Sequence, residues 1–213
     1  MNETTNTQSA APAAGYRPRL SYYHASPKGS GSAINFELHP AHWSAEGNIE
    51  GSLFVSMANQ KTVGVRNGSE TVFPSFDWKN RLVLRLTMTD IAQIVMVFRG
   101  MQESVGEGRG IFHRSARYNT VIKFEHRIDP HPCYALEVYR KSLDGAEQQR
   151  SFIAFSPAEA VGLSLAIEQS MSLLAFGIPE VRERAAQAPS DAPARIRMAA
   201  GAESLSEMGE DPF

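Results

Sequence analysis

Basic and aromatic side chains are interleaved along several stretches of this chain of 213 residues. Lysine and arginine can pair with nucleic-acid phosphates, and exposed aromatic rings can stack on bases, each stack contributing roughly 1–3 kcal/mol. Together they predict a surface for single strands, although any surface sheet carries such residues and half of the rings could belong to the core. The candidates are Tyr22, Tyr23, Lys28, Trp43, Trp78, Lys79, Arg81, Arg85, Arg114, Arg117, Tyr118, Lys123, Arg127, Tyr139, Arg140 and Lys141.

Two pairs of histidines suggest other chemistry at first sight. His39 and His42 are close in sequence, but no Asp or Cys stands at ligand spacing beside them. We therefore expect loop histidines and no metal site. His126 and His131 lie near Asp129, where two prolines indicate a turn between strands.

The glycine-rich stretch at 106–110, GEGRG, lacks the Gly-x-x-x-x-Gly-Lys-Ser/Thr order of a phosphate-binding loop. It predicts a flexible loop between two halves of the chain, with Arg109, Arg114 and Arg117 available to contact a nucleic-acid backbone. A nucleophile, a base and an oxyanion donor do not occur at any recognisable spacing. We therefore expect no catalytic residue, no cofactor and no enzymatic activity.

The composition is that of an ordinary soluble globular protein, with 42% apolar residues, 21% charged residues and a net charge of −2. The longest apolar stretch, IAQIVMVF, is shorter than the roughly 20 residues that cross a bilayer. The first residues lack the apolar segment of a signal peptide. Cys133 is the only cysteine, so no intrachain disulfide is expected. These features predict a cytoplasmic protein.

Residues 32–87 contain three stretches in which apolar and polar side chains alternate, as is typical of half-buried strands. They are SAINFELHP, GSLFVSMAN and NRLVLRLT. The apolar period then changes to that of a helix from Met88 to Phe98. Thr87 is the expected N-cap, and Asp90 completes a variant of the capping box.

The second half predicts the same order of elements. Its strands are YNTVIKFEHRI, YALEVYRKS and RSFIAFS. A longer helix should follow, because Ser156 is a good N-cap, Pro157 suits the first turn and Glu159 completes a capping box. Gly177 is expected to end this helix.

Segments of the two halves also match each other. INFE at 34–37 corresponds to IKFE at 122–125, and RLVLRLTMTD at 81–90 corresponds to RSFIAFSPAE at 150–159. We interpret these matches as a degenerate duplication of one unit of strands followed by a helix. The alternative is that any two strand–helix units look alike at this level.

These segments resemble the Whirly single-stranded-DNA-binding proteins. FDWKNRLVLRLTMTDIAQIV is similar to the Tyr-Asp-Trp-Ser-Arg-Lys stretch, strand and helix start of that family, and FIAFSPAEAVGLSLAIEQSMSLLAFG to its final strand and closing helix. YYHASPKGSGSAINFELHP resembles, with an insertion, the Lys-Gly-Lys-Ala-Ala-Leu strand that opens the domain. Lys28 and Gly29 match the first Lys-Gly, whereas the second Lys is replaced within SGSA.

The resemblance covers about residues 20–177 and implies an α+β fold. Each half would form a unit of about four antiparallel strands plus one helix, with two sheets packed around central helices. The same architecture is built from two chains in the dimeric coactivators of the positive-cofactor-four type. Family members form tetramers and bind single strands in grooves between the sheets of neighbouring subunits. The resemblance therefore implies a homo-oligomer, either a tetramer or a dimer.

Acidic residues are concentrated near the end of the sequence. Residues 16–177 carry 17 Lys or Arg against 15 Asp or Glu, whereas residues 178–213 carry 4 against 7. The final GEDPF resembles the acidic tip of bacterial and phage single-stranded-DNA-binding proteins of other folds. In such a tip, Phe can fill an apolar pocket while the acids steer toward a basic surface. The resemblance implies a protein-recruitment tip, with chance as the alternative, formed by Glu207, Glu210, Asp211, Pro212 and Phe213.

We thus expect a disordered N-terminal tail at 1–18, a Whirly-like domain at 19–178, and a flexible linker at 179–213 that ends in the acidic tip. The expected function is sequence-independent binding and protection of single-stranded DNA in replication, recombination or repair. Replication or repair proteins would be recruited by the tip, and the protein would associate with the nucleoid of a bacterium or with phage or plasmid DNA. Two alternatives stay open: an RNA-binding or transcription-modulating protein on the same scaffold, and a structural homo-oligomer with no nucleic-acid ligand.

Overall fold

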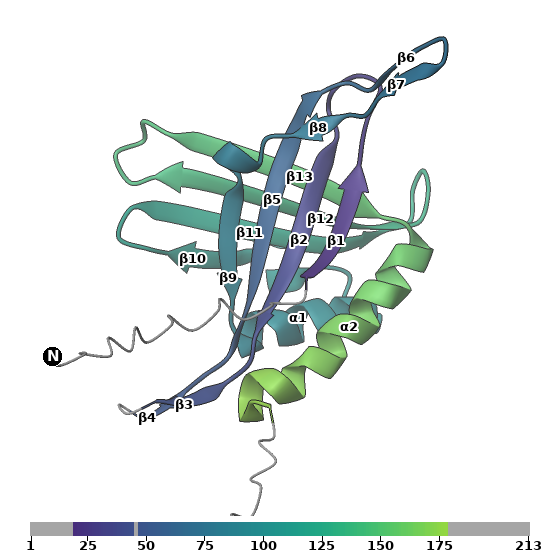
Figure 1. Ribbon diagram of the computed structural model, residues 1–213. Helices are drawn as coiled ribbons and strands as arrows, with labels where there is room; N and C mark the ends of the chain where they lie inside the picture. Colours follow the sequence, from purple (N-terminus) through teal and green to yellow (C-terminus); the bar gives the residue numbers. More distant parts are fainter. Residues whose placement is uncertain (1–18, 45–46, 179–213) are drawn as a thin grey trace, which may run out of the picture. The chain divides into compact units, whose positions relative to one another are not determined.

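The computed structural model describes residues 19–44 and 47–178, whose main elements are two antiparallel sheets and two helices (Figure 1). The first half builds sheet 1 in the order β1-β2-β5-β9, with β8 also pairing with β5. Its elements are β1 (Arg19–His24), β2 (Ser32–His39), β5 (Ser52–Thr62), β8 (Ser75–Phe76), the short helix η1 (Trp78–Asn80), β9 (Leu82–Leu86) and α1 (Met88–Phe98). Two hairpins are inserted in this half, β3 (His42–Ser44) with β4 (Gly47–Ile49), and β6 (Val65–Asn67) with β7 (Glu70–Val72).

The second half builds sheet 2 in the order β10-β11-β12-β13 and ends in a helix of 20 residues. The strands of sheet 2 cross those of sheet 1 (Figure 1). The elements of this half are η2 (Val105–Gly108), β10 (Ile111–Arg114), β11 (Tyr118–Arg127), β12 (Cys133–Ser142), β13 (Gln148–Phe155) and α2 (Pro157–Phe176).

The two halves share one order of elements, four antiparallel strands followed by a helix, once the inserted hairpins and β8 are set aside. The matched segments INFE and IKFE lie in β2 and β11, which are the second strands of their sheets. The other matched pair lies in β9 and β13, the strands that lead into α1 and α2. The predicted α+β fold is therefore confirmed, and the matched segments occupy equivalent positions in it.

Both helices begin at their predicted caps. The backbone N–H of Thr87 donates to the Asp90 carboxylate at 2.8 Å, while the Thr87 hydroxyl accepts from the N–H of Asp90 at 3.4 Å. Ser156 and Glu159 form the same pair of contacts at the start of α2. Each capping box satisfies N–H groups that the first turn of a helix leaves unpaired.

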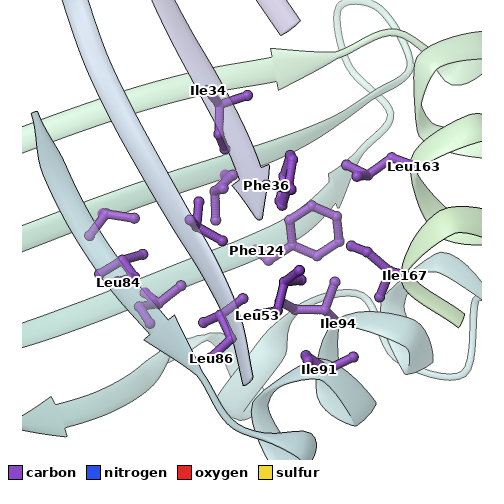
Figure 2. Close-up of a cluster of buried hydrophobic side chains, with 14 of the residues drawn as sticks. Ile34, Phe36, Leu53, Leu84, Leu86, Ile91, Ile94, Phe124, Leu163 and Ile167 are labelled. Atoms are coloured by element: carbon purple, nitrogen blue, oxygen red, sulfur yellow. The ribbon is translucent and has the colours of Figure 1, made fainter. Parts of the chain in front are cut away.

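One apolar core joins the sheets and the helices (Figure 2). Alternate side chains of β2, β5, β9, β11, β12 and β13 enter it, among them Phe36 of β2 and Phe124 of β11. The helices contribute Ile91 from α1 and Leu163 from α2. Burying a side chain of this size contributes roughly 1.5–3 kcal/mol. The strand faces that point away from this core are called outer faces below.

Polar contacts fasten the inner faces of the two sheets to each other. The hydroxyl of Ser32 in β2 donates to the carbonyl of Phe152 in β13 at 2.5 Å. Asn59 of β5 donates through Nδ2 to the carbonyl of Arg150 at 3.1 Å and accepts from the hydroxyl of Ser151 at 3.0 Å. These contacts hold β13 against the two central strands of sheet 1.

An ion pair links the two helices. Arg99, directly after α1, donates through Nε and Nη2 to the carboxylate of Glu168 in α2, at 3.2 and 2.8 Å. The hydrogen bond and the opposite charge raise the pKa of Arg99, and the same contact lowers the pKa of Glu168.

The chain between β2 and β5 holds the end of α2. The N–H groups of Ala41 and Gly51 donate to the carbonyls of Leu173 and Leu174, at 2.9 and 3.0 Å. A Cβ on Gly51 would lie 2.8 Å from the Cα of Leu174, so only glycine permits this close approach. Gly177 ends the helix as predicted, with a φ of 76°.

The side of α2 that faces away from the core is also apolar. Val161 is 61% exposed, Leu165 57% and Phe176 89%. Glu159 and Glu168 are the only charged residues of this helix. A helix that is apolar all round is normally covered on every side. Across the ranges that the structure describes, no helix combines the length and hydrophobicity needed to cross a membrane.

Candidate nucleic-acid interface

The outer face of sheet 1 carries several of the predicted site residues. Residues that pair across the strands form rows on this face. The first row has a basic residue at each end, and the next two rows have small residues in the middle. The first row holds Arg19, Glu37, Phe54 and Arg85, the second Ser21, Asn35, Ser56 and Val83, and the third Tyr23, Ala33 and Ala58.

A hollow of about 420 Å³ opens on this face, and we call it the Trp78 groove. Tyr23 is 57% exposed, and its ring meets the Trp78 ring edge to face. Two guanidinium groups stand beside these rings. Exposed rings and cations in one groove are the features that base stacking and phosphate pairing require. The lining residues are Arg19, Tyr23, Asn35, Glu37, Ser56, Trp78 and Arg81.

The turn at η1 positions Trp78. The Asp77 carboxylate accepts from the backbone N–H and the side-chain amide of Asn80, at 3.3 and 2.8 Å. The side-chain bond is the main reason why the pKa of Asp77 is lowered. Arg81 donates through Nη1 to the carbonyl of Trp78 at 3.0 Å. The Asp-Trp stretch thus forms a turn that holds the indole beside β1.

Two polar groups of the Trp78 groove differ in how they are satisfied. The Glu37 carboxylate accepts from Nε of Arg19 and lies beside Nε2 of His39, both at 2.9 Å, so its charge is offset. The side-chain oxygen of Asn35 is buried and has no hydrogen-bond partner within residues 19–44 and 47–178. A buried carbonyl left unpaired costs about 1–3 kcal/mol, so a donor from a ligand would be stabilising there.

The outer face of sheet 2 carries a second set of rings and cations. Phe112 is 60% exposed, Phe152 40% and Tyr139 37%. Tyr139 pairs across the sheet with Arg150. The guanidinium of Arg127 lies over the Phe152 ring, 5.4 Å from its centroid. This face therefore offers the same two kinds of contact as the Trp78 groove.

The predicted site residues are divided among several places. Tyr23, Trp78, Lys79, Arg81 and Arg85 lie on or next to the outer face of sheet 1. Arg114, Lys123, Arg127, Tyr139 and Lys141 lie on the outer face of sheet 2. Lys28 and Arg117 lie in turns, and Trp43, which is 81% exposed, lies in the β3–β4 hairpin.

Tyr22 faces the interior, unlike its neighbour Tyr23. Its ring meets that of Phe155 edge to face, with centroids 5.2 Å apart. Its hydroxyl donates to the carbonyl of Glu159 at 3.4 Å. Burial and the negative charge of Glu159 raise the pKa of Tyr22. This ring supports the contact between β1 and α2.

Arg140 also lies on the inner side, so the prediction that it belongs to the nucleic-acid surface is wrong. It donates to the hydroxyl of Thr120 at 3.2 Å and to the carbonyl of Val83 in sheet 1. Its guanidinium lies over the ring of Tyr118, 5.4 Å from the centroid. Burial lowers the pKa of Arg140. The alternation of β12 explains this placement, because Val138 and Arg140 share one side of the strand.

Several residues that complete the two outer faces are not among the candidates that the sequence predicts. Arg19 belongs to the edge strand β1, in which tyrosines occupy both faces. Phe112 and Phe152 could have been found from alternation, since each stands next to a buried isoleucine of its strand. The residues missed are Arg19, Asn35 and Ser56 in the Trp78 groove, and Phe112, Arg150 and Phe152 on sheet 2.

Other expectations have mixed outcomes. The segment 106–110 lies between the two halves, as expected, but it begins within the 3₁₀ helix η2. The turn predicted around Asp129 joins β11 to β12.

In the described part of the chain, no cluster of three His, Cys, Asp or Glu side chains could hold a metal ion. The predicted tails at 1–18 and 179–213, including the acidic tip, lie outside the described residues.

Comparison of the sequence with protein-family models and with curated proteins gives no match. Solved structures, however, have similar backbones. WHY1 from Arabidopsis thaliana is 20% identical, with a TM-score of 0.58 over 77% of this chain and 88% of that one. The plant transcriptional regulator PBF-2 is 19% identical, with a TM-score of 0.55 over 76% and 84%. WHY3 from Arabidopsis thaliana is 18% identical, with a TM-score of 0.53 over 77% and 90%. The chain therefore has the fold of the Whirly proteins.

Proposed function

We propose that this protein binds single-stranded DNA without sequence preference and protects exposed strands during replication, recombination or repair. The observation that carries the proposal is the Trp78 groove, where two aromatic rings and two guanidinium groups line one hollow. Every base has a face that can stack, so stacking of this kind tolerates any sequence. The Whirly fold supports the proposal because it presents these side chains on an open sheet.

The net charge of the protein predicts its affinity for single strands. Residues 16–177 carry 17 basic and 15 acidic side chains, so the surface as a whole attracts phosphates only weakly. Attraction is instead local, where Arg19 and Arg81 stand at the groove. We expect moderate affinity that falls as salt rises, because each phosphate contact releases counterions.

The proposal includes self-association into a dimer or tetramer. Its support is the outward side of α2, where Val161 and Leu165 are more than half exposed along a helix with only two charged residues. Covering this side with a second copy would remove apolar surface from water, at roughly 25 cal/mol per Å².

The proposal also assigns partner recruitment to the acidic tip. The segment 178–213 carries 4 basic against 7 acidic residues, and Phe213 follows Pro212 at its end. An acidic segment that carries an aromatic anchor can dock in an apolar pocket with a basic rim. Replication or repair proteins with such pockets are the proposed partners.

The test is a titration of labelled oligo-dT, oligo-rU and duplex DNA at two salt concentrations. We expect oligo-dT to bind in a salt-dependent manner and more tightly than the duplex. Clear preference for oligo-rU would favour the RNA-binding alternative, and no salt-dependent binding to any of them would overturn the proposal. Deletion of residues 204–213 should leave oligo-dT binding intact and abolish capture of replication and repair proteins by the immobilised protein. Undiminished capture would contradict the role of the tip.

A further inference from the structure

A second hollow, of about 640 Å³, opens on the same side of sheet 1. We call it the Phe54 hollow. Its lining combines apolar side chains, such as Phe54, Ile49 and Leu173, with polar ones at Arg85 and His39. None of these five belongs to the Trp78 groove.

The chemistry of the Phe54 hollow, whose lining also includes Glu50, fits a nucleotide, in which the flat base is neutral and the phosphate carries the negative charge. The Phe54 ring and the His39 imidazole lie 4.6 Å apart between centroids, with an angle of 52° between their planes. Arg85 is the cross-strand partner of Phe54 and is exposed. An aromatic surface beside an exposed guanidinium can hold the base of a nucleotide while the cation pairs with its phosphate.

The Phe54 hollow and the Trp78 groove are aligned along the central strands. Tyr23 of the groove pairs with Ala33 of β2, and Phe54 pairs with Glu37 of the same strand β2. The two rows are four residues apart, which corresponds to about 13 Å along a strand. A single strand lying along β2 and β5 would therefore reach both hollows within a few nucleotides.

The carboxylate of Glu37 lines the Trp78 groove and pairs across the sheet with Phe54, but it does not block this path. It accepts from Nε of Arg19 and lies 2.9 Å from Nε2 of His39, so much of its charge is offset. Arg19 and Arg85 occupy the two ends of its cross-strand row. A phosphate crossing this row would meet two guanidinium groups around one paired carboxylate.

We propose that the Phe54 hollow is a second base-binding pocket for the same strand that stacks in the Trp78 groove. The bound strand follows β2 and β5 across the outer face of sheet 1. This inference rests on the proposed function and adds to it the path of the strand and the residues at its second contact, Phe54, His39 and Arg85.

The test compares two lengths of oligo-dT, about 4 and about 16 nucleotides, the limits of the usual site size of single-strand binders. Phe54→Ala should weaken binding of the long oligonucleotide at least about fivefold, the equivalent of one lost stack. It should weaken binding of the short one no more than about twofold, because a short strand can still occupy the Trp78 groove alone. Arg85→Gln changes an exposed side chain and should show the same dependence on length without affecting folding.

Phe73→Ala is the matched control, because Phe73 is 79% exposed and lies after the β6–β7 hairpin, outside both hollows. It should bind both lengths as the unmodified protein does. A long oligo-dT with a single 5-iodouracil should also crosslink to Phe54 or His39 when the iodouracil is at one position, and to Tyr23 or Trp78 when it is a few nucleotides away.

Equal effects of Phe54→Ala on both lengths, or no effect on either, would overturn the second pocket while leaving the proposed function intact. Crosslinks confined to Tyr23 and Trp78 would overturn it as well. If the unmodified protein bound no oligonucleotide, the proposed function itself would fail, and the second pocket with it.

Discussion

The rings of Tyr23 and Trp78 meet edge to face, with an angle of 76° between their planes and 6.3 Å between their centroids. The edge of one ring covers part of the other, so a base can stack only on the ring faces that stay open. Strand β1 and the short helix η1, which are distant in sequence, must therefore both be in place before the stacking surface exists.

Trp78→Ala should lower the affinity for oligo-dT roughly fivefold to a hundredfold, because one base stack contributes about 1–3 kcal/mol. Fluorescence anisotropy with a labelled oligonucleotide measures this change. Trp43→Ala is the matched control, since Trp43 is exposed in the β3–β4 hairpin and does not line the groove. Equal losses for the two variants would contradict the assignment of the groove.

Arg140→Met tests whether Arg140 stabilises the fold or binds nucleic acid, since the sequence predicts it in the nucleic-acid surface. The guanidinium of Arg140 joins β12 to the carbonyl of Val83 in the other sheet. Its loss should lower the free energy of unfolding by about 1–3 kcal/mol, measured by urea denaturation. The folded variant should bind oligo-dT with unchanged affinity. A stable variant with weakened binding would instead place Arg140 in the interface.

Glu159 should make the stability of the protein depend on pH. Burial disfavours its charged form, but the N–H of Ser156, the ring of His24 and the hydroxyl of Ser156 outweigh this effect, and the pKa of Glu159 is lowered. A carboxyl with a lowered pKa stabilises the fold above its ordinary pKa, about 4.3, and loses this contribution as the pH falls through the folded-state pKa.

Glu159→Gln should therefore lower the free energy of unfolding at neutral pH by about 0.3–1 kcal/mol, the range for a negative charge in the first turn of a helix. Urea denaturation at a series of pH values should show this difference shrinking as the pH falls below about 4. Glu70→Gln, at an exposed position of β7, is the control and should have little effect at any pH. A constant difference between Glu159→Gln and the unmodified protein across the series would contradict the role of the charge.

The outward side of α2 should mediate self-association. Leu165→Glu places a charge on a side chain that is 57% exposed, so it should leave the fold intact and shift the protein toward monomer in sedimentation velocity. Gln169→Glu adds the same charge one helical turn later, at a position that is already polar, and should have a smaller effect. A protein that is monomeric before either change would rule out this interface.

The elements that the sequence predicts are those with one buried side. β2, β5, β9, β11, β12 and β13 alternate because they enclose one core, and both helices have capping boxes that depend only on residues three apart. β6 and β7 have no buried residue, so no alternation could indicate them. The edge strand β1 has tyrosines on both faces and escapes the same rule.

The Trp78 groove depends on strand register and on tertiary contacts, which a single sequence does not reveal. Arg19 meets Glu37 through the register of β1 and β2, and Tyr23 meets Trp78 because η1 turns back beside β1. Residue type alone identified Tyr23, Trp78 and Arg81, which carry the chemistry that single strands require. It could not identify Asn35, whose importance lies in a buried oxygen without a partner among the described residues.

The two halves of the chain share their order of elements but no longer share their outer faces. Sheet 1 has the Trp78 groove, whereas sheet 2 has exposed rings at Phe112 and Phe152. If the two halves were identical, exchanging them would leave the binding surface unchanged, and a strand lying across both could bind in either direction. In this chain that exchange is not a symmetry, so a strand that spanned both sheets would bind with one 5′ to 3′ polarity.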